Sequence, residues 1–295
     1  MTKDYKVLNQ LNAGGSPVLK YLLEKNNKNF LLRLYDPRFI QSRYEAFKNI
    51  QTLINNNISV PNIYEYGTLE DNSKGYAIFD YVEGTSLDKM LNRDNEKTYA
   101  IKVADELVKM HNIKIDNATD LYESYITSFN KKISKIENMN LNINLEDIKK
   151  YVIQYSYILR QLNPSIIHGD FNTSNIVACN DKITFIDLDV CRKDVSYNDL
   201  ATCAFNIDNK TFYTYLINEY LNHNYIKDFW IIYNLYGILN TLDYLLYCNR
   251  MDNKTIDEGI RSINQFLEYN NNFQSIEPIW FNKNLTRKAV YKWEN

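Results

Sequence analysis

The first part of the chain alternates short apolar runs with polar turns, a pattern that predicts β-strands. Apolar runs at 18–24 and 30–35 flank a turn rich in Lys and Asn, which predicts a β-hairpin. Apolar residues recur at helical spacing across 42–55, so this segment is predicted to be an amphipathic helix. Two further strand candidates are residues 63–66 and 76–82. We therefore expect a small sheet with one helix.

The rest of the chain is mostly helical in its apolar spacing, most clearly at 100–111 and again from 200 to about 273. The exception is 165–189, where three short β-type runs are joined by polar loops. We predict an α+β fold with two lobes. A small β-rich N-terminal lobe would comprise residues 1–82, and a large helical lobe with a β insert would comprise residues 83–295.

The composition is that of a folded protein without a strong electrostatic field. Lys and Arg number 34 and Asp and Glu 36, so a formal charge of -2 favours neither nucleic acid nor an anionic membrane as partner. The apolar stretch 229–248 is interrupted by Asn and Asp, which favours a buried helix over a membrane span. The N-terminus has no signal-peptide pattern and the four cysteines form no C-x-x-C pair, so we expect a cytoplasmic protein with reduced thiols.

The candidate chemistry lies in the β insert, in the segment HGDFNTSN. His168, Asp170 and Asn175 form the pattern H-x-D-x-x-x-x-N, and an apolar strand then leads to Asp187. Phosphoryl transfer needs a carboxylate that orients the incoming hydroxyl and accepts its proton, and an amide and a second carboxylate that hold magnesium on the triphosphate. Loops at strand ends bring such side chains together. The pattern therefore predicts a kinase that phosphorylates a hydroxyl.

Two features of the N-terminal lobe point the same way. Gly14, Gly15 and Ser16 lie between strand candidates, where flexible backbone could approach phosphates and Ser16 could donate to one. Taken alone, this segment also fits a surface turn. Arg33 lies inside an apolar strand, where it could pair with phosphate oxygens and be oriented by Glu45 of the following helix. An ion pair without function is the alternative for Arg33.

With these motifs the chain resembles the aminoglycoside phosphotransferases, within the wider group that shares the protein-kinase-like fold and includes choline, homoserine and methylthioribose kinases. The resemblance rests on GGSPVLKYLLE, FLLRLYD, YAIFDYVEG, IIHGDFNTSNI, FIDLD and YNDLA, in this order, between about residues 10 and 205. It implies transfer of the γ-phosphate of ATP or GTP, with Mg²⁺, to a hydroxyl of a small molecule, foremost an aminoglycoside-type antibiotic.

The resemblance also implies roles for residues of the catalytic segment. Asp170 takes the position of the catalytic carboxylate, and Asn175 and Asp187 take those of the magnesium ligands. His168 corresponds to the structural histidine of the loop. Asp199 matches an acid that caps a helix and braces the catalytic loop, so we interpret it as structural.

Further positions of the family fall in the N-terminal lobe. Ser16 corresponds to the phosphate-contacting serine, Arg33 to the strand cation, and Glu45 to the helix acid that orients this cation. The segment from Asp80 to Val82 lies where the family's linker offers backbone groups to the adenine. The resemblance therefore implies that Ser16, Arg33, Glu45, Asp80 and Val82 belong to the nucleotide site.

Two positions depart from the family pattern. Arg33 stands where much of the family has lysine, and although its planar fork can grip phosphate, the two side chains are not interchangeable. The metal-binding turn reads DLD, with Asp189 where glycine often stands. We interpret Asp189 as a solvated neighbour of the site, in preference to an outer-shell partner of the metal.

The acceptor is the least determined part of the function. A cationic aminoglycoside needs a pocket lined with carboxylates. Candidates in or beside the C-terminal helices are Asp208, Asp243 and Glu268, each of which also fits a solvated surface acid. Catalytic loops do not fix the acceptor, so a metabolic kinase for choline, homoserine or a sugar stays open. A nucleotide-binding pseudokinase is a third alternative, against which the intact catalytic segment argues.

Overall fold

The structure is a computed structural model that describes residues 4–11, 18–116, 120–204, 209–251, 254–282 and 285. The chain divides into two compact units, which are Met1–Met90 with His168–Arg192, and Leu91–Ile167 with Lys193–Asn295. The first unit takes in the catalytic segment, which the sequence assigns to the C-terminal lobe. The units are therefore not the two predicted lobes, and the lobe boundary at residue 82 stays a prediction.

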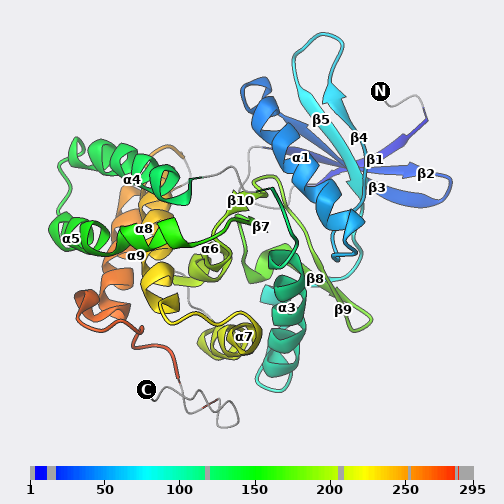
Figure 1. Ribbon diagram of the computed structural model, residues 1–295. Coiled ribbons are helices and arrows are strands. Elements are labelled where there is room, and N and C mark those ends of the chain that lie inside the picture. The colour runs from blue at the N-terminus through cyan, green and yellow to red at the C-terminus, as the bar shows by residue number, and fades with distance from the viewer. Residues whose placement is uncertain are drawn as a thin grey trace. The chain divides into compact units, whose positions relative to one another are not determined.

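A five-stranded antiparallel sheet in the order β1-β2-β3-β5-β4 forms the centre of the first unit (Figure 1). Its strands are β1 (Lys6–Leu11), β2 (Leu19–Lys25), β3 (Lys28–Tyr35), β4 (Ile63–Thr68) and β5 (Gly75–Asp80). The predicted hairpin is confirmed, since β2 and β3 are joined by Asn26 and Asn27 with φ of 52° and 58°. Asn tolerates this left-handed conformation, which two-residue hairpin turns require.

The two faces of this sheet have different partners. Leu23, Phe30, Leu32 and Ile78 form an apolar cluster on one face. Helix α1 (Ile40–Asn55), which follows the 3₁₀ turn η1 (Pro37–Phe39), covers the other face with its apolar side. The Phe47 ring of α1 lies 5.9 Å from that of Phe79, centroid to centroid. Arg33 points to this second face, because residues alternate along a strand.

The first unit also contains the elements that carry the catalytic segment. Strands β6 (Thr85–Ser86), β8 (Ile176–Cys179) and β9 (Lys182–Phe185) form a three-stranded sheet in the order β6-β8-β9. Two short helical elements, α2 (Leu87–Met90) and the 3₁₀ turn η3 (Thr173–Asn175), pack beside it. The Phe185 backbone N–H donates to Ser59 O at 2.9 Å, which ties this sheet to the loop before β4.

The second unit is mainly helical. Its α-helices are α3 (Glu96–His111), α4 (Leu121–Glu137), α5 (Leu145–Tyr155), α6 (Tyr197–Ala201), α7 (Lys210–His223), α8 (Phe229–Cys248) and α9 (Ile256–Tyr269). The remaining elements are the 3₁₀ turns η2 (Ser156–Gln161), η4 (Thr202–Ala204) and η5 (Asn271–Phe273), and the strands β7 (Ser165–Ile167) and β10 (Arg192–Asp194), which pair with each other. Within the described ranges, every helix is too short or too polar to cross a membrane.

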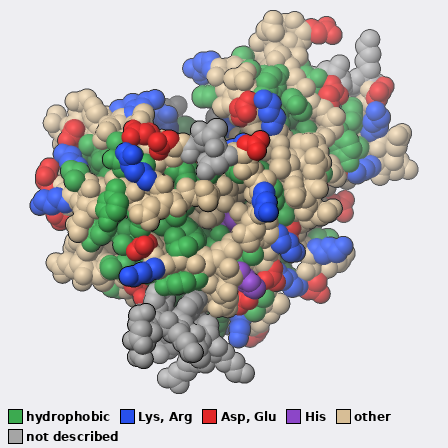
Figure 2. All heavy atoms as spheres, in the orientation of Figure 1, with side chains coloured by type: hydrophobic (Ala, Val, Ile, Leu, Met, Phe, Trp, Pro, Cys, Tyr) green, Lys and Arg blue, Asp and Glu red, His purple; other side chains and the backbone are tan. Residues whose placement is uncertain are grey.

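Local sequence explains where these helices begin and which are buried. Thr255 caps the start of α9, since its side chain accepts from the Glu258 N–H. Helix α8 is apolar around most of its circumference and is buried along nearly its whole length. Figure 2 shows acidic and basic side chains interspersed on the face drawn, as expected from the formal charge of -2. The predicted α+β composition, with an N-terminal sheet and a larger helical part, is confirmed.

Candidate active site

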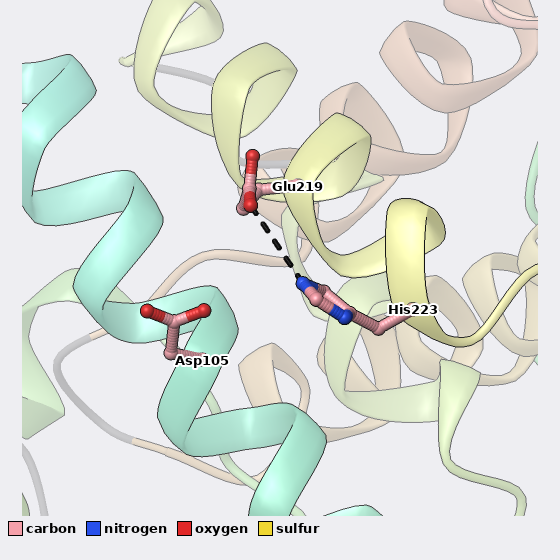
Figure 3. Close-up of side chains that lie close together, drawn as sticks. All are labelled: Asp105, Glu219 and His223. Atoms are coloured by element: carbon pink, nitrogen blue, oxygen red, sulfur yellow. Dashed lines mark ion pairs between the residues drawn. The ribbon is translucent and has the colours of Figure 1, made fainter. Parts of the chain in front are cut away.

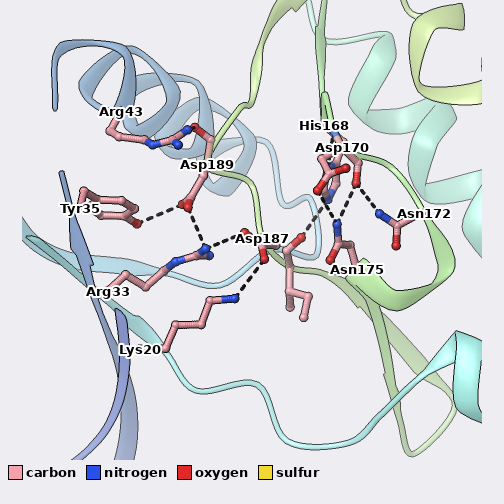
Figure 4. A network of polar contacts seen from close by, with 11 residues as sticks. Lys20, Arg33, Tyr35, Arg43, His168, Asp170, Asn172, Asn175, Asp187 and Asp189 are labelled. Atoms are coloured by element: carbon pink, nitrogen blue, oxygen red, sulfur yellow. Dashed lines mark hydrogen bonds and ion pairs between the residues drawn. The ribbon is translucent and has the colours of Figure 1, made fainter. Parts of the chain in front are cut away.

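His168 fixes the backbone of the catalytic segment. Its fully buried ring donates from Nε2 to the carbonyl oxygen of Ile186 at 2.9 Å, and its Nδ1 accepts from the backbone N–H of Asp170 at 3.3 Å (Figure 4). These two bonds select the neutral tautomer protonated on Nε2. Gly169 has a φ of +82°, and a Cβ there would lie 2.5 Å from the Val190 carbonyl oxygen, so only glycine fits. The loop therefore presents Asp170 in one conformation.

Asn175 holds Asp170 in place. Its Nδ2 donates to the Asp170 carbonyl oxygen at 2.8 Å and to the Asp170 carboxylate Oδ2 at 3.1 Å. Asn172 donates to the same carbonyl oxygen at 3.1 Å and caps the following turn by accepting from the Ser174 N–H. Asp170 is exposed, so its carboxylate can reach a ligand. Because the Asn175 nitrogen is engaged, its amide oxygen is the atom that can bind a cation.

Asp187 follows β9 and lies close to the catalytic segment. The Ile186 N–H donates to Asn175 O at 2.9 Å, which links the two segments directly. Asp187 adopts a φ of 62°, a left-handed conformation that Asp tolerates better than most residues. Burial alone would raise the pKa of this carboxyl, but Arg33 and Lys20 outweigh burial and lower it. Asp187 is thus a carboxylate at neutral pH.

Lys20 and Arg33 both pair with Asp187. Arg33 Nη2 lies 2.6 Å from Asp187 Oδ1, and Lys20 Nζ lies 3.2 Å from Oδ2. Figure 4 shows both cations reaching Asp187 from neighbouring strands. Lys20 is not among the site residues predicted from the sequence. A usable signal existed, because the β2–β3 register pairs Lys20 directly with Arg33 and places both on the same face of the sheet.

Asp189 is buried, so the interpretation as a solvated neighbour is wrong. Only 7% of this residue is exposed. Its carboxylate accepts from the Tyr35 hydroxyl at 3.0 Å and pairs with Arg33 Nη2 at 2.7 Å, while Arg43 of α1 donates to its backbone oxygen (Figure 4). Burial raises the pKa of Asp189, and Arg33 acts in the opposite direction. The second acid of the DLD turn therefore anchors the turn to β3 and α1.

The same contacts correct the expected role of Glu45. Its side chain is 60% exposed and pairs with Lys48 at 2.8 Å on the surface of α1. Arg33 is oriented by Asp187 and Asp189. The helix turns Glu45 to solvent, so in this structure the helix acid does not hold the strand cation.

The predicted adenine segment begins at the end of β5. The Asp80 carboxylate is engaged by its own sheet, because it pairs with Lys28 at 2.7 Å and accepts from the Tyr64 hydroxyl at 2.8 Å and from Asn62 Nδ2 at 2.7 Å. Burial would raise the pKa of Asp80, but these donors lower it. Val82 makes no backbone hydrogen bond with any other described residue. Backbone groups at Val82 are therefore the better candidates for the adenine.

The predicted acceptor acids are not gathered around a common pocket in the described part of the chain. Asp208, like Ser16 with its two glycines, lies outside the described residues. Asp243 of α8 has a side chain that is 62% exposed and pairs with Lys132 at 3.3 Å, and Glu268 is exposed on α9. Neither acid has the buried setting that desolvation of a cationic ligand requires.

Asp243 borders an open groove of about 840 Å³ between α4 and α8. Cations outnumber acids along it. The charged residues that line the groove are Lys131, Lys132, Lys135, Arg250, Glu123 and Asp243. Of the two acids, Asp243 is paired with Lys132 and Glu123 with Arg160. The groove as it stands suits a neutral or anionic ligand better than a polycation.

Two further polar clusters lie in the second unit. His111 and Asp199 have fully buried side chains joined at 3.0 Å, and the other His111 nitrogen lies 2.8 Å from the Tyr220 hydroxyl. Burial raises the pKa of Tyr220 to about 12, so it stays a neutral phenol. This burial fits the structural role predicted for Asp199. Asp105, Glu219 and His223 form the second cluster.

The second cluster lies on the surface of α3 and α7. Asp105, Glu219 and His223 each bring one ligand atom within 4.8 Å of the other two, and Glu219 pairs with His223 at 3.8 Å (Figure 3). Asp105 and His223 are exposed. Because exposed acidic groups commonly gather without an ion, we assign no metal to this cluster.

The first unit thus assembles the oxygen ligands that magnesium prefers. Magnesium in nucleotide sites is held by one or two carboxylates together with substrate phosphates. The Asp187 carboxylate and the Asn175 amide oxygen supply hard ligands beside an exposed Asp170, and lysine and arginine lie next to them. The donor set fits a magnesium nucleotide. An arrangement of this kind can position a hydroxyl and neutralise phosphate charge.

Comparison with known proteins identifies relatives. Residues 8–226 match the Phosphotransferase enzyme family.

Among solved structures, aminoglycoside 2'-phosphotransferase-IIIa in complex with GDP has a TM-score of 0.71 at 14% identity, with 90% of this chain and 94% of that chain covered. The ethanolamine kinase of Plasmodium vivax has a TM-score of 0.63 at 17% identity, with 90% and 82% covered. APH(2'')-IIa in a ternary complex with streptomycin and ATP has a TM-score of 0.63 at 18% identity, with 88% and 91% covered. No curated protein matches the sequence. The predicted protein-kinase-like fold is confirmed.

Proposed function

This chain belongs to the phosphotransferase enzyme family, and from that premise we propose that it transfers the γ-phosphate of ATP or GTP to an aminoglycoside-type acceptor, with Asp170 as its catalytic carboxylate. As a member it is a small-molecule phosphotransferase that uses a nucleotide donor and a hydroxyl acceptor. The single observation that carries the site assignment is the hydrogen-bonded link from Asp170 through Asn175 to the strand end that bears Asp187.

Asp170 would orient the acceptor hydroxyl and take its proton. A general base must come within hydrogen-bonding distance of the proton that it removes, and Asp170 is exposed and rigidly held. The Asn175 amide group restrains the carboxylate so that the exposed oxygen faces the acceptor. This assigns to Asn175 two tasks, which are to position Asp170 through its nitrogen and to bind magnesium through its oxygen.

Asn175 and Asp187 would hold Mg²⁺. When bound, the ion neutralises charge that develops on the transferred phosphate. The chain's own contribution is to keep both oxygen ligands fixed. The bond from Ile186 N–H to Asn175 O sets their spacing, and Arg33 holds one oxygen of Asp187. Backbone groups at Val82 are the proposed adenine partners, and Ser16 a proposed phosphate contact.

The acceptor is proposed as an aminoglycoside because two of the similar solved structures contain kanamycin or streptomycin. The metabolic alternative has its own support. Cations outnumber acids in the groove between α4 and α8, and the acid of that groove proposed as an acceptor ligand, Asp243, is already paired. A neutral sugar or zwitterionic homoserine would not require a carboxylate-lined pocket, whereas choline and ethanolamine, with one positive charge each, would require a smaller one than an aminoglycoside does.

Turnover measurements separate these functions. Release of ADP or GDP is followed with ATP and with GTP, across a panel of aminoglycosides and a panel of amino alcohols, homoserine and sugars. The proposal expects stimulation by at least one aminoglycoside, and loss of that stimulation in Asp170→Asn. Stimulation by a metabolite alone would replace the acceptor and leave the kinase assignment standing. Nucleotide binding without turnover on any compound would favour a pseudokinase.

A further inference from the structure

We infer that Lys20 of β2, and not Arg33 of β3, is the cation that contacts the phosphates of the bound nucleotide. This inference rests on the proposed nucleotide site and adds a residue to it. In this assignment Arg33 is a fixed structural cation that holds the DLD turn. The two residues face each other across neighbouring strands, so the sheet offers either of them to the same place.

Arg33 is ion-paired with two carboxylates, and it cannot readily leave them. Its Nη2 lies 2.6 Å from Asp187 and 2.7 Å from Asp189, and only 4% of the side chain is exposed. Asp189 is itself buried, with the Tyr35 hydroxyl as its other side-chain donor. If Arg33 turned toward a phosphate, the buried Asp189 carboxylate would lose its ion pair and keep the Tyr35 hydroxyl, with Arg43 held at its backbone oxygen as the remaining nearby cation. That loss is strongly destabilising.

Lys20 is held less tightly than Arg33. Its side chain is 14% exposed and makes one ion pair among the described residues, to Asp187 Oδ2 at 3.2 Å. Lysine carries its charge on a flexible stem with rotatable donors, so the ammonium can readily change partner. When Lys20 moves, Asp187 keeps Arg33 on its other oxygen. Movement of Lys20 from Asp187 to a phosphate therefore leaves no charge without a partner. It also frees Oδ2, the oxygen of Asp187 that Arg33 does not hold.

The position of Lys20 in the chain agrees with this assignment. It follows Ser16 by four residues in the sequence, near the start of β2. Glu45 is turned to solvent, so a pair between a strand cation and a helix acid does not form here. The two acids of the DLD turn orient Arg33 instead, and Lys20 is the cation of the pair that can move.

The test compares Lys20→Met with a matched control on the same strand, Lys25→Met. Lys25 is ion-paired with Asp4 at 3.4 Å, and it lies on the opposite face of β2 from Lys20. Affinities for magnesium-ATP, magnesium-GTP, adenosine and guanosine are measured by calorimetry. A hydrogen bond to a charged group contributes about 1.5–3 kcal/mol, so Lys20→Met is expected to weaken the triphosphate about 10- to 150-fold.

The nucleosides lack phosphates, so their affinity should be the same in wild type and Lys20→Met. This readout also shows that the variant retains a folded site. Lys20→Arg should recover part of the triphosphate affinity, and Lys25→Met should match wild type. In turnover assays the KM for the nucleotide should rise more than kcat falls, because uniform binding is lost.

Equal triphosphate affinity in wild type and Lys20→Met would overturn the inference. So would loss of triphosphate affinity in Arg33→Met, measured below its melting temperature, while Lys20→Met binds normally. An equal loss of nucleoside and triphosphate affinity in Lys20→Met would also overturn it, because the effect would not lie at the phosphates. If the wild-type protein binds neither triphosphate, it is the proposed function that fails, and Lys20 is then not at issue.

Discussion

Replacement of Arg33 by methionine should destabilise the protein far more than replacement of its neighbour Lys20. Methionine keeps much of the length and apolar character of the stem but removes the charge. Arg33 is buried between Asp187 and Asp189, at 2.6 Å and 2.7 Å. Removal of one partner of a buried ion pair costs about 3–5 kcal/mol, because the other charge stays buried without compensation.

The contacts place the expected cost toward the lower end of that range. Asp187 would keep Lys20, and Asp189 would keep the Tyr35 hydroxyl. We therefore expect Arg33→Met to lower the free energy of unfolding by about 3 kcal/mol. At about 2–4 °C per kcal/mol for a chain of this order of size, the melting temperature should fall by about 6–12 °C. Lys20→Met removes a partly exposed pair, and should cost about 1 kcal/mol or less.

A double-mutant cycle shows whether the cause is the stranded Asp189 charge. Unfolding is followed by urea denaturation and calorimetry for Arg33→Met, Asp189→Asn and the double variant. The asparagine side chain is neutral yet can still accept from the Tyr35 hydroxyl, so the double variant should be more stable than Arg33→Met by about 2 kcal/mol. Tyr35→Phe, which removes only the hydroxyl, should cost about 1–2 kcal/mol. The reasoning is refuted if Arg33→Met costs under about 1 kcal/mol, or if Asp189→Asn brings no recovery in its background.

Two further variants test other parts of the structure. Asn175→Ala removes the donor that holds the Asp170 carboxylate and one proposed metal ligand, so kcat should fall at least about 100-fold and more magnesium should be needed. Titration of turnover with MgCl₂ measures this, and unchanged magnesium dependence would remove Asn175 from the metal site. Asp199→Ala removes the buried acceptor of His111 and should cost about 2–3 kcal/mol of stability, with nucleoside affinity unchanged by calorimetry. A melting temperature equal to that of wild type would contradict the structural role of Asp199.

The catalytic segment could be predicted from sequence because its geometry is local. His168, Asp170 and Asn175 are bonded mostly to one another and to Ile186, which follows β9. A short loop between short strands leaves few arrangements for these side chains. The residue pattern alone therefore indicated which of them lie together.

The partners of Arg33 could not be read from residue spacing. Glu45 and Asp189 are both acids near the site in the predicted fold, and only the rotation of α1 and the burial of the DLD turn decide between them. The position of Lys20 could have been predicted, because counting residues back from the two-residue turn at Asn26 and Asn27 pairs it with Arg33. The strand register predicts this pairing of Lys20 with Arg33, whereas the apolar runs do not.

The acceptor acids depend on how helices distant in sequence pack. Asp243 interrupts an apolar helix, yet its side chain is exposed and pairs with Lys132, while its neighbours Leu242 and Leu245 are buried. Residue type and helical spacing do not determine such a placement, because it is set by the partner helix α4. The acceptor site therefore cannot be predicted from the residue pattern, because it depends on the tertiary arrangement of the helices.

Transfer of phosphate from a nucleotide to a small-molecule hydroxyl is proposed to depend on the Asp170 carboxylate. The most direct measurement is ³¹P NMR of a reaction that contains magnesium-ATP or magnesium-GTP and each acceptor in turn. We expect one new phosphate monoester for each nucleoside diphosphate formed, with at least one acceptor. The signal should be absent in Asp170→Asn, whose nucleotide affinity should be retained. A monoester formed equally well by Asp170→Asn, or nucleotide bound with no monoester on any acceptor, would contradict the claim.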